Sequence, residues 1–511
     1  MINIATIVER NASRFPDRIA VIDGDRRVTH QELARRVRSV AHALQSMGVG
    51  RGDIVAVLLY NRIEFLEVML AANRIGAAVM PMNYRLSPAE WAYMLGHSGA
   101  VAVLTEGEFE STVEGLWDRL PALSIRLTVS SRPPAGWTSY SALVTAHLGC
   151  STVAVDVRGT ELQRLMYTSG TTSRPKGVML THENILWKNL ALIVEFGLTA
   201  DDHTLICGPM YHVAAMDLPA LATLHCGGGL TLLRKFSANG VLDCLERHRP
   251  TNAWLAPAMM NDIVDTPDVE RRDTTSLRFV VGGGEKMPEP IIGRIEKAFP
   301  SVWFADAYGL TETASGDTVN DREHMRSKIG SVGRPVAHVD IAVVDADDRP
   351  LPANSIGEVV IRAPKVMAGY WRDEAATAAA IRNGWFHTGD IGKIDEDGFL
   401  YIEDRKKDMI ISGGENIATP EVERVLYEHP SVSEAAVIGV PHERWGEVPK
   451  AFIVVRPGAV FDFAEIQEFC RRRLAKYKVP REIEVIEYLP RTPSGKVLKR
   501  DLRSGAVTRP T

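Results

Sequence analysis

Cysteine and long apolar runs are scarce in this chain, and each shortage excludes a class of protein. Only five cysteines occur among 511 residues. They are far apart and odd in number, and we identify neither a Cys-x-x-Cys pair nor a paired Cys/His spacing, so we expect neither a disulfide framework nor a structural zinc site. No run of about eighteen apolar residues occurs and the N-terminus carries early charge, so we expect neither a transmembrane helix nor a signal peptide. These shortages predict a cytoplasmic protein.

Charge of one sign is also lacking. The 59 Lys and Arg residues nearly balance the 64 Asp and Glu residues, and the net charge is −5. Because so mild a charge does not attract polyanions, we expect no nucleic-acid partner and no charge-driven membrane binding. With 45% hydrophobic and 24% charged residues, the chain is globular in composition. At roughly 150 residues per domain, its length predicts two to four folding units.

Strand-like and helical segments alternate over most of the chain. Residues 54–60 are typical of a buried strand, residues 64–74 of a helix, and further strands are predicted at 204–207, 230–233 and 279–281. This alternation predicts an α/β fold in which helices cover parallel sheets. We expect the chemistry at the ends of these strands.

The pattern changes toward the C-terminus. After about residue 330, short strands separated by Pro and Gly turns predict a small β subdomain. Beyond Asp404, a charged run, a glycine pair, predicted helices at 420–427 and 463–474 and a strand at 435–440 predict a separate α+β unit. We therefore expect a large N-terminal lobe of helix-covered sheets with a small β subdomain, residues 1–403, and a smaller C-terminal domain, residues 404–511.

A loop of small and hydroxylated residues follows the apolar pair Leu165-Met166. It runs Tyr167-Thr-Ser-Gly-Thr-Thr-Ser-Arg-Pro-Lys-Gly177. Glycines let backbone N–H groups approach an anion, hydroxyls add donors and the lysine adds charge, so the loop suits a polyphosphate. It is not a Walker loop, because Pro175 replaces the second glycine. A solvated loop is the alternative; the expected phosphate contacts are Thr168, Ser169, Gly170, Thr171, Thr172 and Lys176.

Five further motifs follow in order: Gly282-Gly-Gly-Glu285, Tyr308-Gly-Leu-Thr-Glu312, Thr388-Gly-Asp390, Asp404-Arg-Lys-Lys-Asp408 and Pro493-Ser-Gly-Lys496. Together with the loop they resemble the adenylate-forming superfamily of acyl-CoA synthetases, luciferases and peptide-synthetase adenylation domains. The resemblance spans essentially the whole chain. It implies an ATP-dependent, AMP-forming carboxylate–CoA ligase, which adenylates an acid, releases pyrophosphate and then acylates CoA.

The resemblance also implies the cofactors and the alternatives. ATP, Mg²⁺ and coenzyme A are expected, and a homodimer would be unsurprising for the family. The alternatives are an adenylate-forming ligase that loads a carrier protein and a nonenzymatic nucleotide-binding relative. No carrier-protein serine motif occurs and the chain ends soon after Lys496, so free CoA is the expected acceptor.

The resemblance assigns nucleotide contacts by position. Thr311 is expected to contact the α-phosphate and Glu312 to hold Mg²⁺, with charge neutralised at the reacting phosphate. The adenine slot is expected to include Tyr308, Gly309, Gly284 and Glu285. A packed turn with a surface acid is the alternative for this region.

Four more positions concern the ribose and the rotation of the C-terminal domain. Asp390 is expected to bind the two ribose hydroxyls, which suit one carboxylate, and Arg405 is the second ribose contact; an ordinary Asx turn is the alternative for Asp390. Lys496 matches the lysine that contacts the substrate carboxylate and the α-phosphate during adenylation. Lys407 matches the hinge of the domain alternation, although an ordinary linker would share its features.

The remaining expectations concern the two other substrates. For CoA, the matching positions are Arg85, Gly413, Gly414, Trp445, Tyr477 and Lys478; a solvated basic helix end is the alternative for the lysine. For the acid, His212 is expected beside the reacting carboxylate, with a core histidine as the alternative. Lining positions are Trp187, Met210, Tyr211, Ala214, Ala215, Met216, Gly282 and Gly283.

The small side chains of Ala214 and Ala215 favour an extended acid. We expect a medium- or long-chain fatty acid or an aryl acid such as a cinnamate. Asp217 is unexpected among apolar residues; it either recognises a substrate group or caps the next helix, and we expect the cap.

Overall fold

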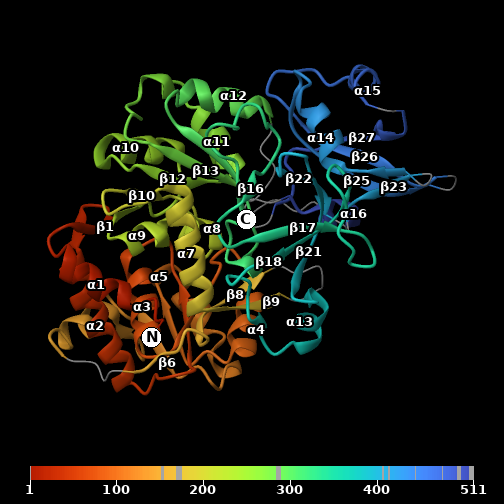
Figure 1. The fold of residues 1–511 in the computed structure, drawn as a ribbon. Coiled ribbons are helices and arrows are strands. Elements are labelled where there is room, and N and C mark those ends of the chain that lie inside the picture. Colours follow the sequence, from red (N-terminus) through yellow and green to blue (C-terminus); the bar gives the residue numbers. More distant parts are fainter. Residues whose placement is uncertain are drawn as a thin grey trace.

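The computed structural model describes residues 2–150, 155–168, 175–283, 289–405, 408–412, 415–442, 445–474, 476–491 and 497–505. Four sheets organise this part of the chain. Figure 1 shows the C-terminal elements, drawn in blue, gathered at one corner of the molecule. In the part of the chain that is described, no helix combines the length and the apolar character needed to cross a membrane.

The first large sheet has eight strands, and its order places the predicted phosphate loop near one edge. Neighbouring strands are parallel except at β8, β9 and β19, which pair antiparallel. The order is β19 (Gly369–Tyr370), β9 (Lys176–Thr181), β8 (Leu162–Thr168), β4 (Ala78–Pro81), β3 (Ile54–Leu58), β5 (Ala102–Thr105), β6 (Ile125–Thr128) and β7 (Thr138–Ser139).

The second large sheet has nine strands and a parallel centre. Antiparallel strands occur only toward its two edges, where β2, β15 and β16 lie. The order is β16 (Arg334–Pro335), β15 (Thr318–Val319), β14 (Trp303–Tyr308), β13 (Phe279–Gly283), β12 (Asn252–Leu255), β10 (His203–Ile206), β11 (Gly229–Leu232), β1 (Ile19–Asp23) and β2 (Arg26–Thr29).

Two five-stranded sheets complete the fold. The third sheet is antiparallel and consists of β17 (Asp340–Val344), β18 (Gly357–Arg362), β21 (Trp385–Ile394) and β20 (Ile381–Arg382), with β22 (Leu400–Arg405) paired to β21. The fourth consists of β24 (Glu415–Ile417), β23 (Ile410–Ser412), β26 (Gly446–Val455) and β25 (Val432–His442), with β27 (Glu482–Val485) parallel to β26.

Helices connect the strands throughout, as the alternation in the sequence predicts. They are α1 (Thr6–Arg14), α2 (His30–Ser46), α3 (Ile63–Arg74), α4 (Pro88–Ser98), α5 (Gly107–Glu114), α6 (Tyr140–Ala146), α7 (His182–Phe196), α8 (Val213–Met216), α9 (Ala222–Cys226), α10 (Ala238–His248), α11 (Pro257–Val264), α12 (Glu289–Ala298), α13 (Glu374–Ala380), α14 (Thr419–Tyr427), α15 (Phe463–Arg471) and α16 (Lys499–Ser504). Short turns are η1 (Trp117–Arg119), η2 (Asp217–Leu221), η3 (Val269–Arg271), η4 (Thr311–Thr313) and η5 (Lys476–Lys478).

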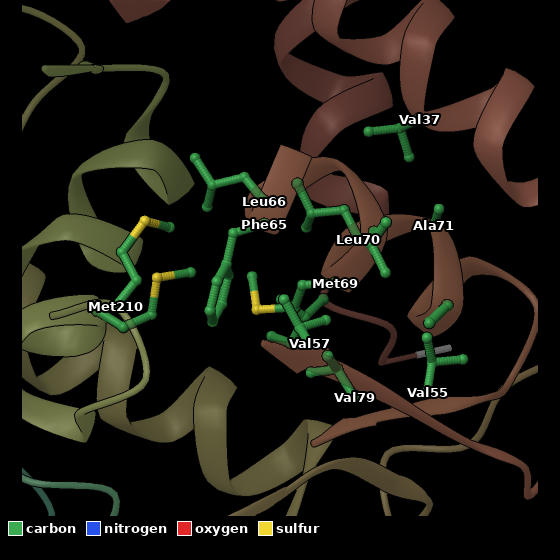
Figure 2. Packing of buried hydrophobic residues seen from close by; sticks show 14 of the residues in the cluster. Val37, Val55, Val57, Phe65, Leu66, Met69, Leu70, Ala71, Val79 and Met210 are labelled. Carbon is green, nitrogen blue, oxygen red and sulfur yellow. The ribbon is translucent and has the colours of Figure 1, made fainter. Parts of the chain in front are cut away.

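The largest core joins the two large sheets. Helix α3 is buried along nearly its whole length, because most of its residues are apolar and its two buried glutamates, Glu64 and Glu67, are paired with arginines. Figure 2 shows Phe65 and Met69 of this helix between the strand residues Val57 and Val79 on one side and Met210 on the other. This packing places the segment that carries the predicted acid pocket against the first sheet.

Candidate active site

The parallel strands of the second sheet end side by side, where ligands bind in open α/β sheets. Gly282 and Gly283 at the end of β13 stand opposite Asp306 and Ala307 of β14. A Cβ on Gly282 would lie 2.4 Å from the Phe304 ring, and one on Gly283 would lie 2.6 Å from the Ala307 carbonyl oxygen. Close packing of the two strands therefore accounts for both glycines.

Tyr308, at the end of β14, reaches the third sheet. Its Oη donates a hydrogen bond of 2.6 Å to Oδ2 of Asp390 on β21. The Asp390 side chain is buried, and its backbone N–H donates to Oγ1 of Thr388 at 3.0 Å. Arg405 of β22 is the register partner of Asp390. The fold thus brings together three residues that the motifs assign to the adenine and ribose.

Glu312 and the phosphate loop meet at a residue that the sequence reasoning missed, Tyr370. Oη of Tyr370 donates to Glu312 Oε1 at 3.0 Å, and the ammonium of Lys176 lies 4.8 Å from the centre of its ring. Burial, with Glu312 as a lesser cause, raises the pKa of Tyr370, so the phenol stays a donor. Lys176 pairs across the hairpin with Thr168, so the two described ends of the loop lie opposite each other.

A buried lysine, also missed by the sequence reasoning, holds the turn that follows Glu312. Lys365 is 1% exposed, and its Nζ contacts the Asp317 carboxylate. Burial lowers the pKa of Lys365 and raises that of Asp317. The same ammonium donates to three carbonyl oxygens, those of Thr313 at 3.1 Å, Ser315 at 2.8 Å and Gly316 at 3.0 Å.

Gly309 belongs to the same turn. A Cβ at this position would lie 2.4 Å from the backbone nitrogen of Gly316. Packing within the turn therefore requires glycine here, whether or not the residue also contacts a nucleotide. Thr311 and Glu312 are presented by η4, between this close approach and the Lys365 contacts.

On the acid side, His212 stacks on Trp254. The ring centres are 5.7 Å apart at an interplanar angle of 20°, and Nδ1 of His212 accepts from the backbone N–H of Ala214 at 3.3 Å. Trp254 is 5% exposed, and its Nε1 has no hydrogen-bond partner among the described residues. Ala214 and Ala215 are buried in the same hydrophobic cluster as Trp254.

The other residues predicted to line the acid pocket lie in different parts of the N-terminal lobe. Met210 and Met216 pack in the core around α3, and Figure 2 shows Met210 beside Phe65. Tyr211 is buried edge-on against Tyr84 at 5.0 Å between ring centres, and burial raises its pKa. Trp187 of α7 is half-buried, with its ring 5.1 Å from that of His338.

Asp217 does not cap a helix, so that expectation is wrong. Its Oδ1 contacts Arg164 Nη2 at 2.7 Å and Lys188 Nζ at 3.0 Å, and all three side chains are essentially fully buried. Burial lowers the pKa of Lys188 to about 8, against the opposing effect of Asp217. A buried acid in an apolar stretch needs a buried cation, and only the fold reveals that these cations come from β8 and α7.

Those residues predicted for CoA that the structure describes are exposed or half-buried. Arg85 is exposed, with its guanidinium 5.8 Å from the Tyr84 ring centre. Trp445 is half-buried between β25 and β26, and Tyr477 is 39% exposed. Lys478, on the same turn as Tyr477, forms an ion pair of 2.6 Å with Glu421.

Contacts of the predicted hinge segment run to the C-terminal elements. The backbone N–H and the hydroxyl of Thr419, which begins α14, both donate to Asp404 Oδ2 at 2.8 Å. Asp408 pairs with Arg503 of α16 at 2.8 Å. Outside the described residues lie the predicted positions Ser169, Gly170, Thr171, Thr172, Gly284, Glu285, Lys407, Gly413, Gly414 and Lys496; of Arg405 only the backbone is described.

Comparisons with known proteins agree over nearly the whole chain. The model of the AMP-binding enzyme family matches residues 8–371, and that of the AMP-binding enzyme C-terminal domain matches residues 421–496. A feruloyl-CoA synthase of an Amycolatopsis species is 39% identical over 499 residues, covering 97% of each chain.

Two solved structures are similar in fold. An anthranilate CoA ligase in complex with anthranoyl-AMP has a TM-score of 0.93 at 28% identity, covering 99% of this chain and 97% of that one. The o-succinylbenzoate CoA synthetase of Bacillus subtilis, solved with its acyl-adenylate intermediate, has a TM-score of 0.86 at 32% identity, covering 97% of each chain.

These likenesses confirm the α/β fold with its large N-terminal and small C-terminal parts, and they confirm the class of reaction. ATP, Mg²⁺ and CoA are its cofactors and substrates. The chain belongs to the AMP-binding enzyme family of the adenylate-forming superfamily and is an AMP-forming acid–CoA ligase.

Proposed function

We propose that the acid is aromatic, a substituted cinnamate or a related aryl acid, rather than a fatty acid. The observation that carries this proposal is the buried stack of His212 on Trp254, with the unpartnered Nε1–H of Trp254. Flat rings offer stacking and edge contacts to another ring. The feruloyl-CoA synthase, anthranilate CoA ligase and o-succinylbenzoate CoA synthetase similar to this chain are named for acids with an aromatic ring.

The unpartnered indole N–H of Trp254 would bind an aryl acid and a fatty acid with different affinity. A buried donor without an acceptor costs about 1–3 kcal/mol, so a ligand that supplies an acceptor gains affinity. The hydroxyl or methoxy oxygen of a substituted aryl acid is such an acceptor, whereas an alkyl chain has none. Trp254 thus favours a substituted aryl acid over both a fatty acid and an unsubstituted ring.

The nucleotide residues then act on ATP. Asp390, oriented by Tyr308 and opposite Arg405, is proposed to hold the ribose hydroxyls. Thr311 and Lys176 are proposed to bind phosphate oxygens and stabilise the charge that develops as the carboxylate attacks the α-phosphorus and pyrophosphate leaves.

The donor set suits magnesium. Glu312 offers carboxylate oxygen, the ligand type that Mg²⁺ prefers, and only Oε1 accepts the Tyr370 bond. When bound, Mg²⁺ supplies charge neutralisation at the phosphates. Tyr370 orients the Glu312 carboxylate, and Lys365 fixes the turn that presents it.

We further propose that residues 404–511 form the mobile domain, which turns about Lys407 after adenylation and withdraws Lys496. In support, Asp404 and Asp408, on either side of the hinge, bind Thr419 and Arg503. The Asp404–Thr419 contact crosses the hinge and would hold one of the two states, whereas the Asp408–Arg503 pair lies within the domain that turns. We also propose a cytoplasmic location, which the five free cysteines favour. A homodimer is a further proposal, and light scattering after size-exclusion chromatography tests it.

A panel of acids tests the proposed specificity. Pyrophosphate release and CoA-thioester formation are measured with cinnamate, 4-hydroxy- and 3-methoxy-4-hydroxycinnamate, benzoate, anthranilate, octanoate and palmitate. The substituted cinnamates should give the highest kcat/KM. A fatty acid with a higher kcat/KM than every aryl acid would overturn the proposal.

The variant Trp254→Phe tests the role of the indole N–H as a hydrogen-bond donor to the acid. This variant should lower kcat/KM for hydroxylated cinnamates about tenfold relative to cinnamate, because one hydrogen bond worth about 1.4 kcal/mol is lost. Trp303→Phe is the matched control, since Trp303 Nε1 already donates to the Asn320 carbonyl at 3.0 Å. Its selectivity should equal that of the parent enzyme.

A further inference from the structure

A cluster of three metal-binding side chains lies away from the active site. His42 projects from α2, and His147 follows α6, which ends at Ala146. Their Nδ1 atoms are 2.9 Å apart. With the thiol of Cys150, the three ligand atoms all lie within 4.8 Å of one another, and each residue is half-buried.

The backbone forms this cluster by two independent means. A turn in which the N–H of Cys150 donates to the His147 carbonyl at 3.1 Å brings these two side chains together. Packing of α6 against α2 then adds His42, which is 105 residues away in sequence. In the part of the chain that the structure describes, this is the one cluster with three such ligands.

The distances are close to those of an occupied site. Zinc bonds of about 2.0–2.1 Å to imidazole and about 2.3 Å to thiolate, in tetrahedral geometry, separate the ligand atoms by about 3.3–3.6 Å. The 2.9 Å between the imidazoles is shorter, and 4.8 Å is the upper limit of the other separations. Rotamer adjustments of about an ångström therefore suffice to reach ligand geometry.

We propose that His42, His147 and Cys150 bind one Zn²⁺ ion that fastens the end of α6 to α2. Two imidazoles and a thiolate form a ligand set that selects zinc over the hard cation of the nucleotide site. A fourth position is left for water. The expectation of no zinc site rested on the absence of a Cys-x-x-Cys pair and of a paired Cys/His spacing, but His147-x-x-Cys150 is such a spacing.

The site is separate from the chemistry. In the eight-stranded sheet, β7, which leads into α6, is one edge, whereas β8, β9 and β19 beside the phosphate loop lie at the other. The ion would act as a structural clip. Removing it should leave the KM for ATP unchanged while lowering thermal stability, since a ligand that binds only the folded state stabilises it.

Metal titration of the full-length, tag-free, chelator-treated protein tests the proposal. With excess Mg²⁺ to fill hard-cation sites, Zn²⁺ should bind with 1:1 stoichiometry and raise the melting temperature. Co²⁺ should give the thiolate charge-transfer band in the near ultraviolet and the visible bands of a tetrahedral site. No thiolate band, or a stoichiometry of zero, would overturn the proposal.

Variants separate this site from incidental binding. Cys150→Ser should abolish the charge-transfer band and weaken Zn²⁺ binding at least tenfold, since even loss of outer-shell partners costs about 10- to 100-fold. His42→Asn should weaken binding similarly, and it provides a second test if the cysteine variant does not fold. Cys244→Ser, which alters a half-buried cysteine elsewhere, is the matched control and should bind as the parent does. Equal Zn²⁺ affinity in all variants would contradict the assignment.

Discussion

Replacing Lys365 by methionine should destabilise the N-terminal lobe and weaken the nucleotide site together. The ammonium is 1% exposed, and it holds three carbonyl oxygens and the Asp317 carboxylate. Methionine has a similar length but donates no hydrogen bond, so Asp317 is left as a buried charge without its cation. Breaking a buried pair in this way costs about 3–5 kcal/mol. Urea unfolding followed by circular dichroism measures the loss.

Two further variants make the reasoning refutable. Lys365→Met combined with Asp317→Asn should recover at least about 1 kcal/mol, because no unpaired charge remains. Lys297→Met removes an exposed ion pair of 2.8 Å with Glu270, and it should cost under about 1 kcal/mol. The free energy of unfolding of the Lys297→Met control should lie within about 1 kcal/mol of that of the parent protein. If the free energy of unfolding of Lys365→Met is equally close, the buried ammonium does not hold the turn. Pyrophosphate release should fall in the single variant, because Glu312 loses its support.

Four other results are expected. Tyr308→Phe should raise the KM for ATP about tenfold, since hydrogen bonds to charged groups such as Asp390 contribute about 1.5 kcal/mol or more; an unchanged KM in pyrophosphate exchange would contradict this role. Lys496→Ala should abolish pyrophosphate exchange yet spare thioester formation from preformed acyl-AMP, and equal loss of both would refute the assignment. Lys407→Pro should leave one half-reaction and stop the other, so two normal half-reactions would exclude the hinge. Burial lowers the pKa of His182 to about 4. Because the unfolded state then binds the extra proton, His182 alone should lower stability by about 2 kcal/mol between pH 7 and pH 5, in addition to the falls due to His203 and His225, whose pKa burial also lowers to about 4. A flat profile in urea titrations, or an equal fall in His182→Gln, would contradict this.

Motifs that resemble those of the family supply the expected roles of most candidate site residues. Residues at a backbone turn or a strand end are recognised from the residue types at fixed distances around them. Examples are the motif that ends at Glu312 and the turn before Asp390. Tyr370 and Lys365 are not predicted in this way, because they lie 48 to 58 residues from the groups that they hold. Nothing in the neighbouring sequence of a lone tyrosine or lysine predicts such a contact.

The sequence by itself determined the alternation of strands and helices, because periodicity and turn chemistry are short-range properties. The class of enzyme followed from the resemblance of its ordered motifs to the adenylate-forming superfamily. Tertiary structure alone decided which distant groups meet. It placed Asp217 between Arg164 and Lys188 rather than on a helix end, and it brought His42 to within 2.9 Å of His147. The physical reason is that burial forces each charged or polar group to find a partner, and the packing of whole elements determines which partner lies within reach.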